Sequence, residues 1–291
     1  MIPAPFDYFA PRTLKEALTL LNQHGEEAKL LAGGQSLLPL MKLRLGRPKL
    51  VIDINRIPGF GKIKESDGEF HLGAMTRHVA VEESKPLRKK LAILPETATW
   101  IGDPQVRNLG TIGGSLAHAD PAADYPTVVS ALQARFQLKS LHGERWISAE
   151  DFFIDMMTTA LEPTEMITEI VFPKLPPRTG AVYLKLERKA GDFATVGVAA
   201  VITLDADSRC SESRLFIGAV GPKPIRARGG EEHLKGQHLT ESLLNQAAEA
   251  AALGTDPETD LRGSREYKQA VTRVYTARAL KEAFRRAGGR A

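Results

Sequence analysis

Two glycine-rich segments of the sequence combine residue types and spacing suited to anion binding: Ala32-Gly33-Gly34-Gln35-Ser36 and Gly110-Thr111-Ile112-Gly113-Gly114-Ser115. Glycine lets backbone N–H groups converge on a ligand, and a helix that begins after such a turn favours negative charge. We expect each turn to follow a strand or an extended approach and to open into an apolar helix. Neither turn matches the Rossmann or the Walker sequence motif. Together they predict two anchor points on one long anionic ligand, such as a dinucleotide pyrophosphate.

Other polar residues near these turns admit more than one role. Arg107 could pair with a phosphate or brace its own loop, because its fork of donors suits both. Asp124, just before Pro126, could cap a helix. Read with His118 and Asp120, it could also belong to a metal cluster, but the spacing is loose and a proline interrupts any shared helical face. The sequence therefore predicts no metal site.

Composition and charge are those of an ordinary globular chain. The sequence has 291 residues, is 43% hydrophobic and carries a formal net charge of +4, with 35 acidic residues interspersed among 39 basic ones. Aromatic residues are only 6%, and no basic block alternates with stacking residues. A nucleic-acid binder is therefore the least favoured class, and the basic residues near the C-terminus are expected to form a solvated helix face.

The cysteine count restricts redox chemistry more than the charge does. Cys210 is the single cysteine, so the chain can form neither an internal disulfide nor a cysteine-ligated iron–sulfur cluster. With no histidine nearby, its thiol is expected to be incidental. The first residues lack the pattern of a signal peptide and no apolar run is long enough for a membrane span, so a cytoplasmic location is expected.

The first half of the chain predicts short alternating helices and strands. An amphipathic helix over 13–22 begins with a capping box, strands over 29–31 and 50–54 flank the first glycine turn, and together they form a βαβ-like unit. A hairpin over 61–75, helices over 79–83 and 87–99, an apolar helix over 128–132 and strands over 135–140 and 167–172 follow.

The pattern changes after the proline-rich segment 173–177. Residues 181–188, 196–204 and 213–220 alternate like strands of an antiparallel sheet, and helices are predicted over 240–253 and 264–287. We therefore expect a domain over residues 1–175, with subdomains of about 1–57 and 58–175, and a C-terminal α+β domain over residues 176–291. The fold class is α+β.

Four segments carry a resemblance to a known family. The sequence resembles the FAD-binding medium subunit of molybdenum hydroxylases, the carbon monoxide dehydrogenase and xanthine dehydrogenase family, at residues 32–44 (AGGQSLLPLMKLR), 107–115 (RNLGTIGGS), 120–126 (DPAADYP) and 188–194 (RKAGDFA). Either glycine motif alone would be weak, but both together, about 75 residues apart, are specific. The resemblance extends over nearly the whole chain.

The resemblance implies a PCMH-type FAD-binding domain of two α/β subdomains that clasp FAD, followed by a domain with an antiparallel sheet and helices. The pyrophosphate would lie on the two glycine turns. Asp124 would bind ribityl or ribose hydroxyls, Ile167 would pack on the flavin ring unless it is a core residue, and Lys185 would lie near the isoalloxazine unless it is an exposed strand lysine. The implied FAD-binding residues are Ala32, Gly33, Gly34, Gln35, Ser36, Gly110, Thr111, Ile112, Gly113, Gly114, Ser115, Asp124, Ile167 and Lys185.

The function implied by the resemblance is electron transfer. A partner large subunit would hold a molybdenum cofactor, a partner small subunit would hold 2Fe–2S clusters, and FAD in this chain would pass the electrons to a quinone, NAD or oxygen. The complex would be a dimer of heterotrimers. Two alternatives stay open: a stand-alone FAD-dependent oxidoreductase of the same fold, and a non-enzymatic nucleotide-binding assembly subunit. The sequence names neither the substrate nor the acceptor.

Overall fold

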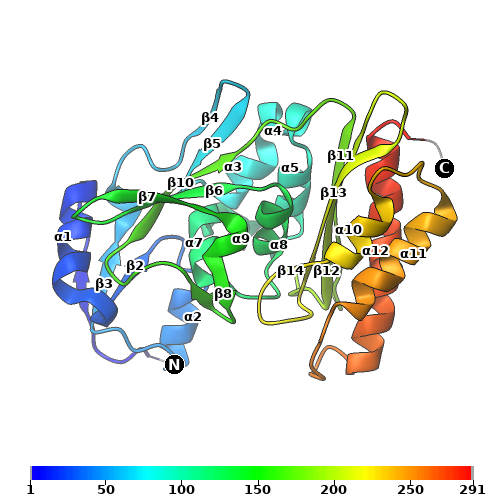
Figure 1. Cartoon of the computed structure of the whole chain (residues 1–291). Coiled ribbons are helices and arrows are strands. Elements are labelled where there is room, and N and C mark those ends of the chain that lie inside the picture. Colours follow the sequence, from blue (N-terminus) through cyan, green and yellow to red (C-terminus); the bar gives the residue numbers. More distant parts are fainter. Residues whose placement is uncertain (1, 290–291) are drawn as a thin grey trace.

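The structure of the chain is a computed structural model that describes residues 2–289. Its elements are arranged around three main sheets that follow one another from the N-terminal to the C-terminal side of the molecule (Figure 1). The last sheet is covered on its outer side by helices, and a small two-stranded hairpin, β8 (Phe153–Asp155) and β9 (Thr158–Thr159), lies beside the middle region. The α+β class predicted from the sequence is confirmed.

The first sheet is parallel and contains the first predicted strands. Its order is β1–β3–β2, with β1 (Asp7–Phe9), β2 (Ala28–Leu31) and β3 (Leu50–Asp53). Helix α1 (Leu14–His24) covers it, and the Thr13 hydroxyl caps that helix by accepting from the Glu16 N–H, as predicted. Between β2 and β3 the chain forms the first glycine turn and α2 (Leu37–Lys42), so the expected βαβ-like unit is present.

The second sheet is antiparallel in all its pairs, so an α/β pattern describes only the first sheet. Its order is β4–β5–β10–β6–β7, with β4 (Ile63–Ser66), β5 (Glu69–Gly73), β6 (Arg135–Lys139), β7 (Glu144–Ser148) and β10 (Met166–Phe172). The pair β4–β5 is the hairpin predicted over 61–75, whereas β7 was not predicted. A buried core that includes Phe70, Leu72 and Phe136 joins this sheet to its helices.

Short helices fill the region beside the second sheet. They are α3 (His78–Glu83), α4 (Lys85–Lys90), α5 (Ile93–Thr99), α6 (Pro104–Leu109), α7 (Ile112–His118), α8 (Asp124–Ala131) and α9 (Ala149–Phe152). The expectation of an extended approach to the second glycine turn was wrong, because α6 occupies it. The Asp103 carboxylate accepts from the Val106 N–H, and Pro104 stands in the first turn of this helix.

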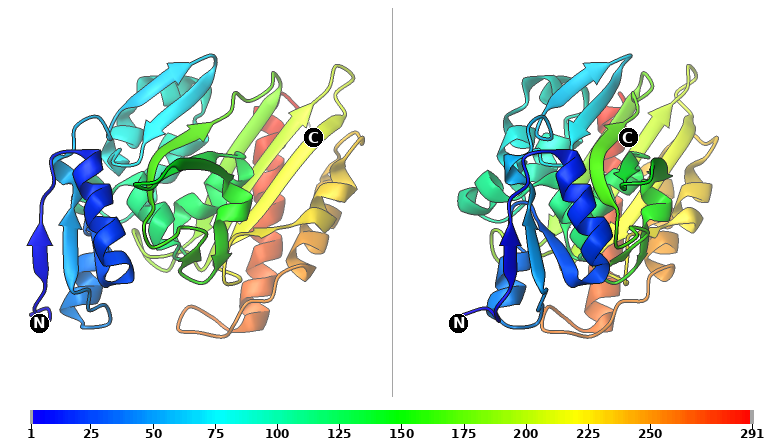
Figure 2. Two further views of the ribbon diagram at one scale, coloured as in Figure 1. Left: turned by 60° about the vertical axis from the view of Figure 1, so that its left-hand side comes forward. Right: turned by 90° about the vertical axis from the view of Figure 1, so that its left-hand side faces the viewer.

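The third sheet is antiparallel, as predicted, and lies between two layers of helices (Figure 2). Its order is β11–β12–β13–β14, with β11 (Thr179–Leu186), β12 (Val196–Leu204), β13 (Cys210–Gly218) and the unpredicted β14 (Ile225–Arg226). Every residue of β12 is buried: Ala199 and Val201 join the core shared with α8, while Val198 and Ala200 face the outer helices. Those helices are α10 (Arg228–Leu234), α11 (Glu241–Leu253) and α12 (Arg265–Arg286), of which α10 was not predicted. None of the helices described is both long and apolar enough to cross a membrane.

Candidate functional site

The first glycine turn presents unpaired backbone donors. Over residues 2–289, no protein acceptor pairs with the backbone N–H groups of residues 33–36, which are half-buried or exposed. Gly34 has a φ of +73°, a left-handed conformation that favours glycine. Ser36 stands at the N-cap of α2 without making a side-chain cap bond. Unpaired N–H groups at the start of a helix are suited to binding an anion.

The second glycine turn is built differently, because its N–H groups are already bonded. Ile112 and Gly113 donate to the carbonyls of Thr76 and Ala74 at 3.0 and 2.9 Å. The Thr111 hydroxyl caps α7 by accepting from the Gly114 N–H at 3.1 Å. Residues 110–113 are buried, whereas residues 114 and 115 remain half-buried. This turn therefore offers a ligand the Ser115 hydroxyl and its surface, but few backbone donors.

The structure brings the two turns into contact. A Cβ atom on Gly33 would lie 2.3 Å from the Leu109 carbonyl oxygen and 2.6 Å from Cα of Gly110, so only glycine permits this approach. A Cβ on Gly113 would lie 2.6 Å from Ala74 in the same way. The sequence suggested that the two turns bind a common ligand, and their contact makes such a shared site geometrically possible.

Two residues that the sequence did not single out tie the turns together. The Asn55 amide donates to the Ala32 carbonyl at 2.8 Å, and the Arg77 guanidinium donates to Asn55 Oδ1 at 2.6 Å. The same guanidinium also donates to the carbonyl of Leu109, at the entrance of the second turn. No sequence motif marks these residues, which lie 22 positions apart; Asn55 follows β3 and Arg77 follows β5.

Asp124 and Lys185, predicted as separate ligands, form one buried cluster. The Lys185 ammonium lies 3.2 Å from the Asp124 carboxylate, 3.1 Å from the Trp100 carbonyl oxygen and 3.4 Å from Glu187. The Tyr183 hydroxyl donates to Asp124 at 2.8 Å. Burial raises the pKa of Asp124 to about 6, although Lys185 and the Tyr183 hydrogen bond oppose the shift. Lys185 is thus not the exposed strand lysine that the sequence left open.

The other candidates have mostly structural surroundings. Ile167 is 5% exposed within the core of the second sheet. Arg107 pairs with Glu82 at 2.7 Å and donates to the carbonyls of residues 101 and 102, so it braces its loop. Cys210 is buried, and burial raises the pKa of its thiol to about 11, which suits an unreactive residue. No metal-binding group of three His, Cys, Asp or Glu side chains occurs in the part of the chain that the structure describes.

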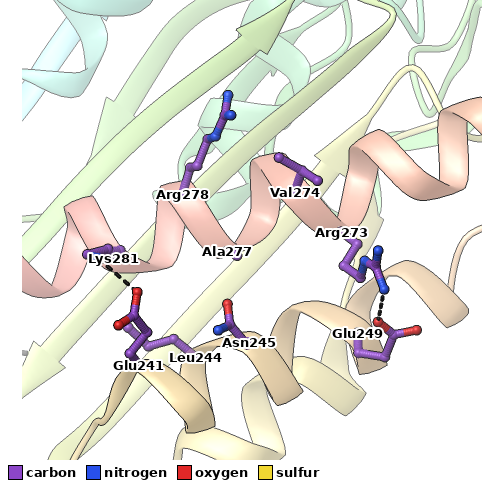
Figure 3. Close-up of a pocket in the computed structure, with 9 residues that line it drawn as sticks. All are labelled: Glu241, Leu244, Asn245, Glu249, Arg273, Val274, Ala277, Arg278 and Lys281. Carbon is purple, nitrogen blue, oxygen red and sulfur yellow. Dashed lines mark hydrogen bonds and ion pairs between the residues drawn. The ribbon is translucent and has the colours of Figure 1, made fainter.

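A surface cavity of about 500 Å³ lies apart from the glycine turns, between α11 and α12 (Figure 3). Ion pairs join the two helices across it, Lys281 to Glu241 at 3.0 Å and Arg273 to Glu249 at 3.1 Å. It shares no residue with the predicted FAD-binding set. We therefore regard the cavity as a gap in the packing of α11 against α12 and not as part of the FAD site.

Comparison with protein families shows which cofactor this chain binds. Residues 4–175 match the FAD binding domain in molybdopterin dehydrogenase, and residues 181–283 match the CO dehydrogenase flavoprotein C-terminal domain. The chain belongs to the family of FAD-binding medium subunits of molybdenum hydroxylases. It is the FAD-binding, oxidoreductase flavin subunit that the resemblance implied. The unpaired N–H groups of the first turn fit the phosphates of that cofactor.

Relatives in this family match over almost their whole length. The carbon monoxide dehydrogenase medium chain of Hydrogenophaga pseudoflava is 42% identical over 98% of this chain and 99% of its own. The alpha subunit of the 6-hydroxypseudooxynicotine dehydrogenase complex of Paenarthrobacter nicotinovorans is also 42% identical, over 99% and 97%. Among solved structures, carbon monoxide dehydrogenase from Hydrogenophaga pseudoflava superposes with a TM-score of 0.95 at 43% identity, covering 98% of this chain and 99% of that one.

Proposed function

We propose that the first glycine turn holds the pyrophosphate of FAD and that the second turn forms the adjoining wall. The N–H groups of Gly33, Gly34, Gln35 and Ser36 are directed to no protein acceptor within residues 2–289, whereas those of residues 112–115 are satisfied by the protein. This difference carries the proposal, because a buried or partly buried donor without a partner favours a ligand that can accept from it. The Ser36 and Ser115 hydroxyls would add donors beside the phosphates.

The other predicted ligands stay in the proposal with a restricted role. Both oxygens of Asp124 accept from Tyr183 or Lys185, so a ribityl or ribose hydroxyl would have to use a remaining lone pair. Lys185 is surrounded by acceptors of the protein, and contact with the flavin would require it to give one up. Ile167 would contact the flavin ring only at the edge of its buried core. We therefore infer that the cluster acts on FAD chiefly through its charge.

We also propose the electron path that the family implies. FAD supplies the redox chemistry of this chain, and its residues bind and orient it. Because a single cysteine cannot ligate an iron–sulfur cluster, relay clusters would come from a small subunit, and a large subunit would hold the molybdenum cofactor. A dimer of heterotrimers is the proposed assembly. Relatives are named for carbon monoxide, glyceraldehyde, nicotine and caffeine, which supports a substrate site outside this chain.

The domain limits and the location remain proposals from the sequence. We place the domains at residues 1–175 and 176–291, a division supported by the break between the two matched families, which falls between residues 175 and 181. A cytoplasmic location is likewise a proposal.

Expression of the full chain with and without its genomic neighbours tests this function. We expect a yellow protein that releases FAD on heating and that co-purifies with molybdenum and iron when the partner subunits are present. A colourless chain that ignores added FAD would contradict the proposal. A chain that reduces an acceptor with a substrate of its own, without partners, would favour the stand-alone oxidoreductase instead.

A further inference from the structure

We propose that Asn55 and Arg77 form a clamp that sets the distance between the two glycine turns and thereby determines how tightly FAD is held. The inference rests on the proposed FAD site and assigns a positioning role to two residues outside the glycine motifs. Neither residue is proposed to touch the cofactor.

The clamp connects the first sheet to the second turn through a continuous set of hydrogen bonds. Asn55, which follows β3, donates both to the Ala32 carbonyl and to Asp53 Oδ1, at 2.8 and 2.7 Å. The Tyr8 hydroxyl of β1 donates to the other oxygen of Asp53 at 2.6 Å. Three segments of the first sheet therefore hold the Asn55 amide in one orientation, with its oxygen directed at Arg77.

Arg77 completes the connection from the other side. It stands at the N-cap of α3, and its guanidinium donates with one nitrogen to Asn55 Oδ1 and with another to the Leu109 carbonyl. That carbonyl is the group that Gly33 approaches most closely. Arg77 therefore fixes the contact point of the two turns from outside, and a planar fork with two donors is needed to reach both acceptors at once.

The second turn depends on the same segment of chain. Backbone bonds join the Ile112 N–H to the Thr76 carbonyl and the His78 N–H to the Gly110 carbonyl, at 3.0 Å each. Arg77 thus belongs to the strand-like segment on which the second turn is built. A shift of Arg77 would move the second turn relative to the first without changing the donors of either turn.

The first experiment measures the FAD dissociation constant of the apo full-length chain by flavin fluorescence for four proteins: wild type, Asn55→Ala, Arg77→Ala and the double variant. We expect each single variant to weaken binding about tenfold, as loss of one hydrogen bond in a fixed network can. We expect the double variant to be little weaker than the worse single variant, because both changes break one clamp. If the double variant instead lost FAD affinity by the product of the two single losses, the two residues would act independently and the proposal would be overturned.

Two further variants separate positioning from charge and from general stability. Arg77→Lys keeps the charge but not the fork, so it should lose FAD affinity about as much as Arg77→Ala; wild-type affinity would overturn the clamp. Arg145→Ala is the matched control, since Arg145 also joins a side chain, Glu165, to a backbone carbonyl, that of Ala160. It should leave FAD affinity unchanged. If the wild-type chain itself binds no FAD, the proposed function fails rather than the clamp.

Discussion

The two glycine turns have similar sequences but different structural roles. In the first turn the backbone donors of residues 33–36 have no acceptor in the part of the protein that the structure describes. In the second turn the donors of residues 112–115 are bonded to Thr76, Ala74 and Thr111. The first turn is therefore suited to binding and the second to support.

The difference shows that a glycine-rich motif does not by itself identify an anion-binding site. Ser36 and Thr111 occupy equivalent N-cap positions of α2 and α7, yet only Thr111 makes a cap bond. The N–H groups of the second turn are taken by the segment of residues 74–76 that crosses it. What decides the role of each turn is the neighbouring chain, which the motif does not contain.

Glycine replacements should separate the two roles most strongly. Gly113→Val would place a side chain 2.6 Å from Ala74 and should lower the free energy of unfolding by more than about 3 kcal/mol, with loss of FAD. Gly33→Val would press against the Leu109 carbonyl just as closely, but Gly33 is half-buried and its turn can shift toward solvent, whereas Gly113 is buried. This variant should therefore abolish FAD retention at a smaller cost in stability. Urea unfolding and the flavin content of the purified protein measure both effects.

Gly143 provides the control for these replacements. It lies in the β6–β7 turn, and a Cβ atom there would meet nothing within 4 Å. Gly143→Val should therefore change the free energy of unfolding by less than about 0.5 kcal/mol. An equal loss of stability in the Gly33, Gly113 and Gly143 variants would remove the distinction between the turns.

Acid should weaken the support of the second turn through His78, whose ring lies against Gly110. Burial, with the charges of Arg77 and Arg107, lowers the pKa of His78 from 6.5 to about 4. The unfolded chain then binds more protons between these values, so stability falls as the pH falls through this window. From pH 7 to pH 4.5, wild type should lose about 2–3 kcal/mol of unfolding free energy relative to His78→Asn.

Comparing wild type with His78→Asn cancels the contribution of the other titrating groups to the pH dependence of stability. Asp124, whose raised pKa has the opposite effect on stability between about pH 4 and 6, is present in both proteins and cancels. Urea unfolding at the two pH values gives the difference. If the unfolding free energies of wild type and His78→Asn differed by the same amount at both pH values, His78 would not be held neutral behind the turn.

The two N-cap residues offer a smaller and more specific contrast. Thr111→Ala removes a cap bond and should cost about 1 kcal/mol of stability. Ser36→Ala removes no side-chain hydrogen bond within the described residues and should leave the unfolding free energy within about 0.5 kcal/mol while weakening FAD binding. Denaturation and FAD titration of both variants test this. A loss of stability in Ser36→Ala, with a loss of FAD affinity only in Thr111→Ala, would contradict it.

Much of the fold could be predicted because its signals are local. The N-cap at Thr13, the antiparallel strands after residue 177 and the long final helix each have a periodic or terminal pattern in the sequence, although the Glu16 carboxylate accepts from the Arg12 N–H and not from Thr13 as a capping box requires. Helix α6 had such a pattern too, with Asp103 and Pro104 at its start, and an extended approach was predicted in its place. Strand β14 and helix α10 are short and lack a clear period.

The site was less predictable because its contacts join distant segments. Lys185 and Asp124 were each singled out, but nothing in the sequence shows that residues 61 positions apart form one buried pair. Asn55 and Arg77 have no motif, and their importance follows only from the acceptors that they reach. Likewise, the pairing of donors in the second turn depends on residues 74–76, which the motif does not include.

Amide hydrogen exchange, with and without FAD, tests the proposed division between the turns most directly. Without FAD, the N–H groups of residues 33–36 should exchange fast and those of residues 112–115 slowly, since only the latter are bonded. Addition of FAD should protect residues 33–36 and change residues 112–115 little. Protection gained at residues 112–115, with residues 33–36 still exchanging fast, would contradict the proposal that the first turn holds the phosphates.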